Sequence, residues 1–423
     1  MLLTVSMIAA GAASPAHGTT SMHHRPSRSS PADSVLAWNI TSANVAVAAG
    51  VFQPEGLIKL SYVQAAVYDA VVAIDGGFEP YVGHLRGPWT ASVDAAVAAA
   101  ARATLVARFP TQLATIDTAY STALAAVPDG RAKRDGVAVG ARAAAELLAA
   151  RSGDGLDAAT TYVFGSGVGA WVLPTDNTNP ALQTPQTPWV AQMRPFLIRR
   201  ADQFRPGPPP AVTTALYARD LNEVQAYGAR TSTVRTASQT DVARFWTANA
   251  LTFNNAVVRQ ITTSQGFDAA ETARALALGV MVDADADIAC FDAKYHYSFW
   301  RPYTAIRNAD TDGNPATTAD PDWLPLFPTP NHPEYPAAHT CSSAADALLY
   351  ADLLGTSRLN LGITSPATGT THFFATTDDL NDEVISARVW AGLHYRNSGE
   401  VGARLGTAVA RVALHDALEP ANH

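Results

Sequence analysis

The sequence has few cysteines, few charged residues and no long uninterrupted apolar run. It contains two cysteines among 423 residues, so at most one disulfide can form within the chain. Charged residues make up 16%, and the formal net charge of −8 argues against a nucleic acid or an anionic membrane as the main partner. No segment reaches the length needed to cross a bilayer, so we expect no membrane span. Any anion site must therefore be local and enclosed.

The composition favours helices. Hydrophobic residues account for 48% of the chain, with many alanines and few runs of β-branched residues. Alanine has the highest helix propensity, whereas strands favour β-branched side chains. A chain of this length can form one large domain or two smaller ones. We therefore predict an all-α protein made of two packed helix bundles.

Apolar spacing and alanine content place the helices along the chain. No internal repeat and no alternating strand pattern stands out. Ser238, followed three residues later by Asp241, resembles a capping box and predicts the start of a further helix there. Long stretches without periodicity, 152–210 and 308–336, are predicted to be loops. The predicted helices span residues 55–75, 91–107, 112–126, 131–151, 212–227, 268–300, 337–354, 377–394 and 400–417.

The first residues have the features of an export signal. A short apolar stretch ends in Ser14-Pro15-Ala16, which resembles a cleavage site, although the usual basic start is missing. Residues 17–34 are rich in Ser, Pro and His and predict a disordered linker. We therefore expect residues 1–34 to be a signal segment and linker, and the protein to be secreted or periplasmic. The helical domain would be 35–423, with an N-terminal lobe of about 35–151, the loop 152–210 and an active-site bundle of 211–423.

Three short stretches in the last third of the chain bring cations and histidines together with apolar residues. In the first, Lys294 and Arg301 are seven residues apart and are predicted to share one face of a helix. The neighbouring side chains are aromatic, and a buried cation needs a partner. A solvated stripe of two cations is the alternative. The aromatic neighbours are Tyr295, Tyr297, Phe299 and Trp300.

The second and third stretches supply a helix start and a second arginine. Pro336 suits the first turn of a helix, which would leave the amides of residues 337–339 free to face an anion beside His339. Arg388 falls on the apolar stripe of its helix, where a guanidinium must find a carboxylate or an oxyanion. His394 lies off that stripe unless Gly392 loosens the last turn. The alternatives are a core role for His339 and a surface position for His394.

These motifs, Lys-x6-Arg-Pro, Pro-x-x-His and Arg-x5-His, resemble the type 2 phosphatidic acid phosphatase (PAP2) superfamily, which includes acid phosphatases and vanadium-dependent haloperoxidases. The resemblance covers most of residues 38–420 and implies an all-α, haloperoxidase-like fold. Three further segments are closer to the soluble haloperoxidase branch. They are Phe299-Trp300-Arg301-Pro302, Ala65-Ala66-Val67-Tyr68-Asp69-Ala70 and Asp202-Gln203-Phe204-Arg205-Pro206.

The resemblance implies a role for each motif residue. His394 would be the vanadate ligand of a haloperoxidase or the phosphohistidine nucleophile of a phosphatase. His339 would act as general acid–base. Vanadate rests in the five-coordinate geometry that phosphate reaches only during transfer, so one pocket could serve either chemistry. The oxyanion would be held by Lys294, Arg301, Arg388 and the amide of Ala338.

The chain departs from the family pattern at four positions. Ala337-Ala338 replaces the usual Ser-Gly before the histidine, and the loss of the serine at Ala337 removes a hydroxyl donor that contributes about 1.5–3 kcal/mol at a charged oxygen. Phe291 stands where the chloride-oxidising members carry tryptophan. His332 stands where they carry phenylalanine and where bromide-oxidising members often have histidine. The resemblance therefore implies bromide or iodide as the halide.

Three functions remain open from the sequence. The first is a haloperoxidase that uses vanadate, hydrogen peroxide, a halide and an organic acceptor. The second is a phosphatase that hydrolyses a phosphate ester without a cofactor, and the third is a catalytically weak oxyanion-binding protein. A metal site of His332, Glu334 and His339 is disfavoured because it lacks a helical ligand spacing. Cys290 and Cys341 could form a disulfide or remain free thiols.

Overall fold

The structure is a computed structural model, which describes residues 31–177 and 183–421. The predicted signal and most of the linker lie outside these residues. The described part of the N-terminal half forms five α-helices, α1 (Pro31–Ala48), α2 (Gln53–Asp75), α3 (Val93–Arg108), α4 (Leu113–Ala126) and α5 (Arg131–Ala150). The C-terminal half forms eight more, α6 (Ala215–Tyr227), α7 (Ala237–Phe245), α8 (Ala250–Gln265), α9 (Ala269–Tyr297), α10 (Pro302–Arg307), α11 (Ala338–Leu354), α12 (Thr377–Trp390) and α13 (Arg396–Asp416).

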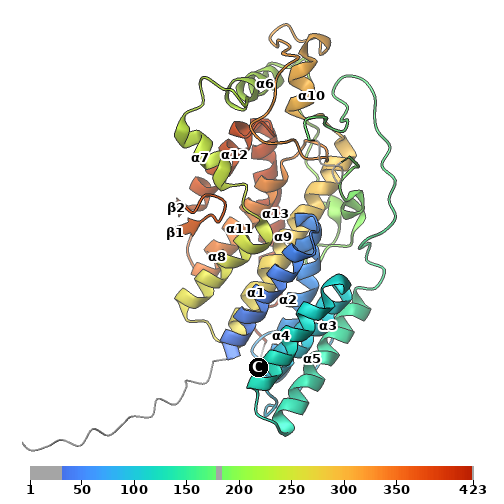
Figure 1. Cartoon of the computed structure of the whole chain (residues 1–423), viewed down its shortest axis with the longest axis vertical. Coiled ribbons are helices and arrows are strands. Elements are labelled where there is room, and N and C mark those ends of the chain that lie inside the picture. Colours follow the sequence, from blue (N-terminus) through green and yellow to red (C-terminus); the bar gives the residue numbers. More distant parts are fainter. Residues whose placement is uncertain (1–30, 178–182, 422–423) are drawn as a thin grey trace, which may run out of the picture.

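The all-α class predicted from the composition is confirmed. Figure 1 shows an elongated molecule with α3, α4 and α5 at one end and α6 and α10 at the other. The predicted loop 152–210 contains only two short 3-10 helices, Pro188–Gln192 and Ala201–Phe204, among its described residues. The division into an N-terminal lobe, this loop and a C-terminal bundle stays a prediction.

Helix α9 is the central helix around which several others pack. It contacts α2, α8, α11 and α13, and all but a few of its residues are buried. Its start is fixed by a capping box, in which Asp268 accepts from the amide of Glu271 and Glu271 accepts from the amide of Asp268. An apolar helix that is buried on all sides belongs in the core of a large protein. Helix α9 thus carries residues from the core to the site near its C-terminal end.

Helix α2 corrects the expectation that no segment is long enough to cross a bilayer. Within the described residues it passes that test by length and composition, but 89% of its apolar window is buried inside the protein. It packs against α3 and α9 and ends at Gly76 and Gly77, both with positive φ. We interpret α2 as a core helix.

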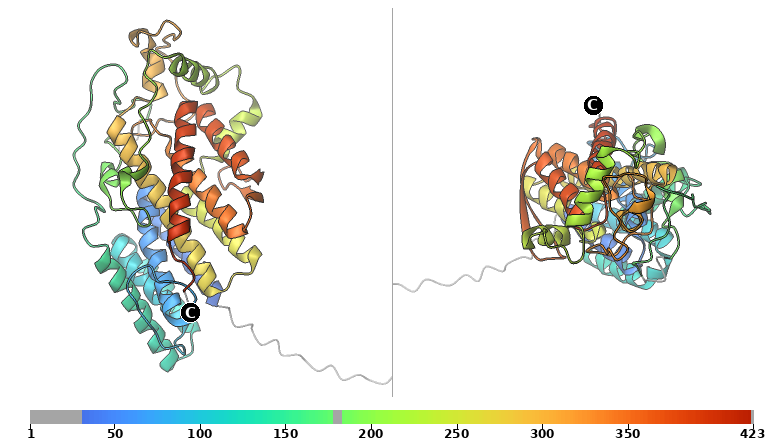
Figure 2. Two further views of the ribbon diagram at one scale, coloured as in Figure 1. Left: turned by 180° about the vertical axis from the view of Figure 1, so that it is seen from behind. Right: turned by 90° about the horizontal axis from the view of Figure 1, so that it is seen from above.

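Helices α11 and α13 pack closely because α13 presents glycines to α11. A Cβ added to Gly406 would lie 1.9 Å from the carbonyl oxygen of Cys341, and one added to Gly402 would lie 2.2 Å from the hydroxyl of Thr340. This approach places the start of α13 beside the start of α11. Figure 2 shows α13 from behind, along the face of the bundle. The turn that precedes α13 therefore lies near His339.

The hairpin between α11 and α12 differs from the prediction. Strands β1 (Arg358–Thr364) and β2 (Thr371–Thr376) form an antiparallel pair, where the sequence predicts no strand. The alternation is present, because Leu359, Leu361 and Ile363 are buried between more exposed neighbours, but it is too short to distinguish from a helix end. The hairpin lies beside α12.

Two predicted boundaries also move. Helix α7 begins with a capping box of Thr236 and Gln239, two residues before the predicted pair of Ser238 and Asp241. Both pairs fit the sequence pattern of a capping box. In the structure the reciprocal hydrogen bonds between side chains and backbone amides are made by the earlier pair. Helix α1 begins at Pro31, so residues 31–34 are not part of a disordered linker.

Candidate active site

Lys294 and Arg301 belong to two different helices. Helix α9 ends at Tyr297 because Ser298 adopts a left-handed conformation with φ of 47°, and Arg301 is the N-cap of α10. The prediction that both cations share one helix face is therefore wrong. Both side chains are nevertheless fully buried, at 0% exposure, so the alternative of a solvated stripe is also wrong.

The Lys294 ammonium group is held by backbone carbonyls of the loop before α11. It donates to the carbonyls of Pro333 (3.0 Å), Glu334 (2.9 Å) and Pro336 (2.5 Å). Burial lowers the pKa of Lys294 to about 8. In this arrangement Lys294 fixes the position of residues 333–336, and its predicted contact with an oxyanion remains a prediction.

The Arg301 guanidinium joins three parts of the site. Its Nε donates to the carbonyl of His332 (2.9 Å), and Nη1 lies 3.0 Å from both the carbonyl of Leu393 and Nε2 of His394. Its Nη2 lies 3.1 Å from Nδ1 of His332. Arg301 therefore brings together the loop before α11 and the turn after α12.

Arg388 is the least satisfied of the cations. It is 3% exposed, which confirms its predicted place on the apolar stripe of α12. Its Nη1 makes a long contact of 3.4 Å with the carbonyl of Trp246, and its Nε is buried without a hydrogen-bond partner. A buried guanidinium with an unpaired donor is costly unless an acceptor reaches it.

The cluster has an excess of positive charge. Within the described part of the chain, no carboxylate lies within 4.0 Å of Lys294, Arg301 or Arg388, and Glu334 and Asp176 act on Arg301 only from a greater distance. Burial lowers the pKa of Arg301 to about 10 and that of Arg388 to about 9. Three buried cations without a carboxylate in contact leave positive charge that an anion with several oxygens would neutralise.

His394 is oriented by Glu334. Its Nδ1 lies 2.9 Å from Oε1 of Glu334, and the same oxygen accepts from the amide of Tyr395 (3.1 Å). Burial, then the charges of Arg301 and Lys294, lower the pKa of His394 well below its usual value. The imidazole is thus neutral, with its proton on Nδ1 facing Glu334, and the lone pair of Nε2 accepts from Nη1 of Arg301. His394 is 2% exposed, so it is not a surface histidine.

The turn that carries His394 depends on Gly392, as the sequence suggested. Helix α12 ends at Trp390, and Gly392 has a φ of 81°. The amides of Leu393 and His394 then both lie within 3.4 Å of the carbonyl of Arg388. This tight turn is what brings Nε2 of His394 back to Arg301.

Helix α11 begins one residue later than predicted, and Pro336 is not in its first turn. The bond between Tyr335 and Pro336 is cis, and Pro336 precedes the helix, whose N-cap is Ala337. The amide of Ala337 donates to the carbonyl of Ser398, so it is not available to an anion. The amides of Ala338 and His339 belong to the first turn, where helix geometry provides no acceptor. They are the donors left to an oxyanion at this helix start.

His339 is exposed and lines a cavity, so it is not a core histidine. The protein packed around the ring, and then the charges of Arg388, Lys294 and Arg301, lower its pKa well below its usual value. Because the ring is reached from the cavity, water weakens the first of these causes, and the direction of the shift depends mainly on the cations. A neutral imidazole at this place can accept a proton from a group in the cavity.

The predicted halide positions, Phe291 and His332, form an aromatic wall. Their ring centroids are 5.2 Å apart, and Phe52 lies 6.2 Å from Phe291 and 6.0 Å from His332. Burial, then the charges of Arg301 and Lys294, lower the pKa of His332 well below its usual value. Phe52 comes from the loop before α2, which no sequence signal connects with the site.

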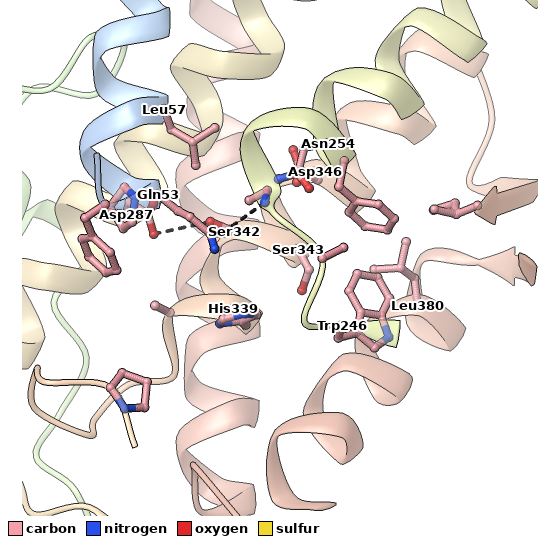
Figure 3. Close-up of a pocket in the computed structure, with 18 of the residues that line it drawn as sticks. Gln53, Leu57, Trp246, Asn254, Asp287, His339, Ser342, Ser343, Asp346 and Leu380 are labelled. Atoms are coloured by element: carbon pink, nitrogen blue, oxygen red, sulfur yellow. Dashed lines mark hydrogen bonds between the residues drawn. The ribbon is translucent and has the colours of Figure 1, made fainter. Parts of the chain in front are cut away.

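The cavity has a volume of about 220 Å³ and extends away from His339 between α8, α9, α11 and the loop before α2. Figure 3 shows His339 at one part of it and Asp346 with Asn254 at another. Its apolar lining includes Leu57, Trp246, Phe253, Tyr350 and Leu380. The cation cluster thus adjoins a cavity large enough for an organic molecule.

Two further expectations concern metal and disulfide chemistry. Throughout residues 31–177 and 183–421, no group of three His, Cys, Asp or Glu residues is placed to hold a metal ion, and this includes His332, Glu334 and His339, which the sequence already disfavoured as a metal site. Cys290 and Cys341 are both buried free thiols, and Sγ of Cys290 lies 3.7 Å from the carbonyl of Pro336.

Comparison with known proteins agrees with this geometry. Residues 274–423 match the family described as the VCPO second helical-bundle domain. The fold resembles a bacterial vanadium-dependent iodoperoxidase, with a TM-score of 0.78 and 21% identity over 92% of this chain and 98% of that one. It also resembles a bacterial vanadium-dependent chloroperoxidase, with a TM-score of 0.70 and 18% identity over 86% of this chain and 92% of that one. No curated protein matches the sequence.

These matches confirm the resemblance seen in the three sequence motifs. The motif residues, from Phe291 to His394, all fall within the matched segment 274–423. Residues 274–423 therefore resemble the second helical-bundle domain of that family, and the chain as a whole has the helical fold of these vanadium-dependent haloperoxidases.

Proposed function

We propose that this protein is a vanadium-dependent haloperoxidase that oxidises bromide or iodide with hydrogen peroxide, with vanadate bound at His394. The observation that carries the proposal is the buried excess of positive charge beside a neutral histidine. Lys294, Arg301 and Arg388 have no carboxylate within 4.0 Å among the residues described. An oxyanion would neutralise the positive charge, and its central atom could accept the nitrogen lone pair of the neutral histidine.

The residues present fit vanadate. Arg388 has an unpaired buried Nε, Ala338 and His339 offer helix amides, and His394 presents Nε2. Vanadate, when bound, supplies Lewis-acid activation of hydrogen peroxide toward attack by a halide. The same donors would also bind phosphate. They therefore select for an oxyanion but do not distinguish vanadate from phosphate.

The protein's own residues have separable roles in this proposal. Arg301 and Arg388 neutralise oxyanion charge, and Glu334 keeps the proton of His394 on Nδ1. His339, neutral and facing the cavity, accepts a proton from hydrogen peroxide as it binds and returns it to the leaving oxygen. Lys294 holds the loop that carries Glu334, and its charge favours the negative form of the bound group.

The halide preference rests on the aromatic wall. Phe291 and His332 replace the larger and more apolar pair that the chloride-oxidising relatives are expected to carry. A neutral imidazole beside Arg301 offers a polar contact to a large, weakly hydrated halide. We therefore propose bromide or iodide over chloride.

The test compares halogenation and phosphatase activity in the same preparation. Purified protein is assayed with hydrogen peroxide and bromide or iodide on a dye acceptor, with and without orthovanadate, and separately with a chromogenic phosphate ester. We expect halogenation that depends on vanadate and disappears in His394→Ala. His415→Ala, an exposed histidine on the last turn of α13, is the matched control and should keep full activity.

The two other functions give different results in this experiment. A PAP2-type phosphatase with a phosphohistidine on His394 would hydrolyse the ester and be inhibited by vanadate. A catalytically weak oxyanion-binding protein would show neither activity, while phosphate would still raise its melting temperature. Either result would overturn the haloperoxidase proposal.

A further inference from the structure

The cavity beside His339 contains acidic side chains that have no cationic partner. Asp283 and Asp287 come from α9 and Asp346 comes from α11, and they are 1%, 3% and 4% exposed. Within the described residues none of them is in an ion pair, and Asp287 and Asp346 line the cavity. Buried carboxyl groups normally have a charged partner or are functional.

A serine beside them is also unsatisfied. The hydroxyl of Ser343 is buried without a hydrogen-bond partner, although this residue lines the cavity and is only 8% exposed. Its neighbours do have partners, since Asn254 donates to Oδ2 of Asp283 (2.8 Å) and Ser342 donates to Oδ1 of Asp287 (3.4 Å). No hydrogen bond reaches the Asp346 carboxyl group from a described residue. Ser343 and Asp346 thus offer acceptors to something that is not part of the chain.

These groups share one face of α11 with His339. The spacing along the helix is three, one and three residues for His339, Ser342, Ser343 and Asp346. Figure 3 shows Ser343 between His339 and Asp346. At about 1.5 Å per residue, the seven residues from His339 to Asp346 span about 10 Å along the helix. The apolar side chains that line the rest of the cavity are Leu57, Trp246, Phe253 and Leu380.

We propose that this cavity is the binding site for an organic acceptor with an apolar ring and a primary ammonium group, the ammonium bound by Asp346 and Ser343. An ammonium has three donors, which match the Asp346 carboxylate and the Ser343 hydroxyl. The ring would pack on Phe253 and Leu57 and reach toward His339. A molecule the size of tryptamine suits a length of about 10 Å.

A metal ion fits this place less well than an ammonium. Among the residues that the structure describes, the three aspartates are not arranged to bind a metal ion. One wall of the cavity is apolar, which favours an amphipathic guest over a hydrated ion. Burial, then the neighbouring Asp283 and Asp287, raise the pKa of Asp346 well above its usual value, and a bound ammonium would favour the ionised carboxylate again.

The role of the guest as acceptor rests on the proposed function. Hydrogen peroxide, halide and a proton give hypohalous acid and water, and hypohalous acid then replaces a ring hydrogen of the acceptor with halogen and releases water. An ammonium held at Asp346 directs the ring toward the end of the cavity where the oxidant forms. Binding itself requires no activity, so it is measured separately.

The experiment measures binding to the vanadate-free full chain by calorimetry at pH 7.5. The probes are tryptamine, 3-propylindole, in which a methyl group replaces the ammonium, and indole-3-propionate. We expect tryptamine to bind at least about tenfold more tightly than either analogue, because a charge-assisted hydrogen bond is lost in both. Raising the salt concentration should weaken tryptamine binding but not 3-propylindole binding, because only the first depends on an ion pair.

Variants locate the contact. Asp346→Asn and Ser343→Ala should each weaken tryptamine binding, the first by at least about tenfold. Binding of 3-propylindole should not change. Asp352→Asn, at an exposed position of the same helix, is the matched control and should bind tryptamine like the unchanged protein.

The comparison of probes needs no variant, so it stands even if Asp346→Asn does not fold. Equal binding of tryptamine and 3-propylindole, no binding of either, or displacement of tryptamine by millimolar calcium would overturn the proposal. If tryptamine binds but vanadate supports no halogenation of a dye, the proposed function fails while the ammonium site remains.

Discussion

Glu334 is the residue on which the orientation of His394 depends. Its Oε1 accepts from both Nδ1 of His394 and the amide of Tyr395. Carboxylates that orient a ligating histidine commonly change affinity or activity by about 10–100-fold when they are removed. We expect Glu334→Ala to lower vanadate affinity by about that factor, because the proton of His394 is then free to move to Nε2.

The conservative variant separates orientation from simple packing. Glu334→Gln retains an acceptor for Nδ1, so it should recover most of the affinity that Glu334→Ala loses. The vanadate affinity of both variants is measured by titration, with the halogenation rate and the melting temperature as readouts. Equal losses in the two variants would mean that Glu334 acts through its charge, not by orienting the imidazole.

Ala337 is the position where a serine is missing. It is fully buried, and as the N-cap of α11 it makes no side-chain hydrogen bond. A hydroxyl that donates to a charged oxygen contributes about 1.5–3 kcal/mol, so Ala337→Ser should raise vanadate affinity by at least about tenfold. Alternatively, the new hydroxyl would cap α11. The melting temperature would then rise without vanadate, and the vanadate affinity would not change, which would contradict the prediction.

The sequence predicted those site residues whose chemistry conflicts with their surroundings. Arg388 on an apolar stripe and Lys294 among aromatic residues could be recognised because burial of a cation requires an anion. The sequence indicates Glu334 only as a metal ligand, since nothing in a linear sequence shows which histidine an acidic residue faces. Asp346 gives no signal, because one aspartate in an alanine-rich helix has the same pattern as a solvated position.

At the scale of elements, the contact between α11 and α13 sets the distance between the two histidines of the site. Gly406 faces the backbone of Cys341 so closely that any side chain requires the helices to move apart. Overpacking of this kind costs about 1–3 kcal/mol, which exceeds the gain in helix propensity from glycine to alanine of about 1 kcal/mol. We expect Gly406→Ala to lower the melting temperature by several degrees and to reduce halogenation.

A second glycine provides the control for this prediction. A Cβ added to Gly207 would have no atom within 4 Å, and this residue has no positive φ, so Gly207→Ala should leave the melting temperature and the activity unchanged. Thermal unfolding of both variants, with and without vanadate, is the measurement. A Gly406→Ala protein as stable as the unchanged chain would show that α13 can shift without affecting the bundle.

The elements that the sequence predicted well are those whose signals are local. Helices α3 and α4 begin within two residues of the predicted positions, because alanine content and apolar spacing act over one helix. The end of α9 could not be predicted, because Ser298 adopts a positive φ that serine rarely takes without tertiary contacts. In the structure the hydroxyl of Tyr162, more than a hundred residues away, donates to the Ser298 side chain.

At the scale of the whole molecule, the chain has a net charge of −8, and its core contains ionisable groups of both signs. The cation cluster around Arg301 and the acidic groups around Asp346 lie in the same region, joined by one cavity. Long-range attraction therefore does not draw anions to the protein surface, and selectivity for an oxyanion must come from the enclosed cluster. This is the arrangement that the overall composition predicted.

The buried carboxyl groups also determine how the stability of the whole protein depends on pH. Burial raises the pKa of Asp69 to about 7 and that of Asp285 to about 6, although backbone amides donate to both. A raised pKa means that the folded protein binds more protons than the unfolded chain between about pH 4 and pH 7. Their stabilising contribution is complete at low pH and is lost as the pH rises through the folded-state pKa.

The histidines of the site act in the opposite direction over a different range. The pKa values of His332, His339 and His394 are lowered in the folded protein, so their contribution increases with pH only up to about 6.5. Lys294, with a pKa of about 8, stabilises the folded state increasingly only above that value. Between pH 6.5 and pH 8 Asp69 loses its proton in the folded state, and we expect its contribution to lower the melting temperature over this range.

Asp69→Asn tests which groups cause this fall. Asp69 is 3% exposed and its ionisation over this range costs roughly 1 kcal/mol, so the variant should lose a measurable part of the slope of melting temperature against pH. Asp352→Asn, at an exposed position, should keep the full slope. An Asp69→Asn protein with the same slope as the unchanged chain would mean that Asp69 is already ionised over this range.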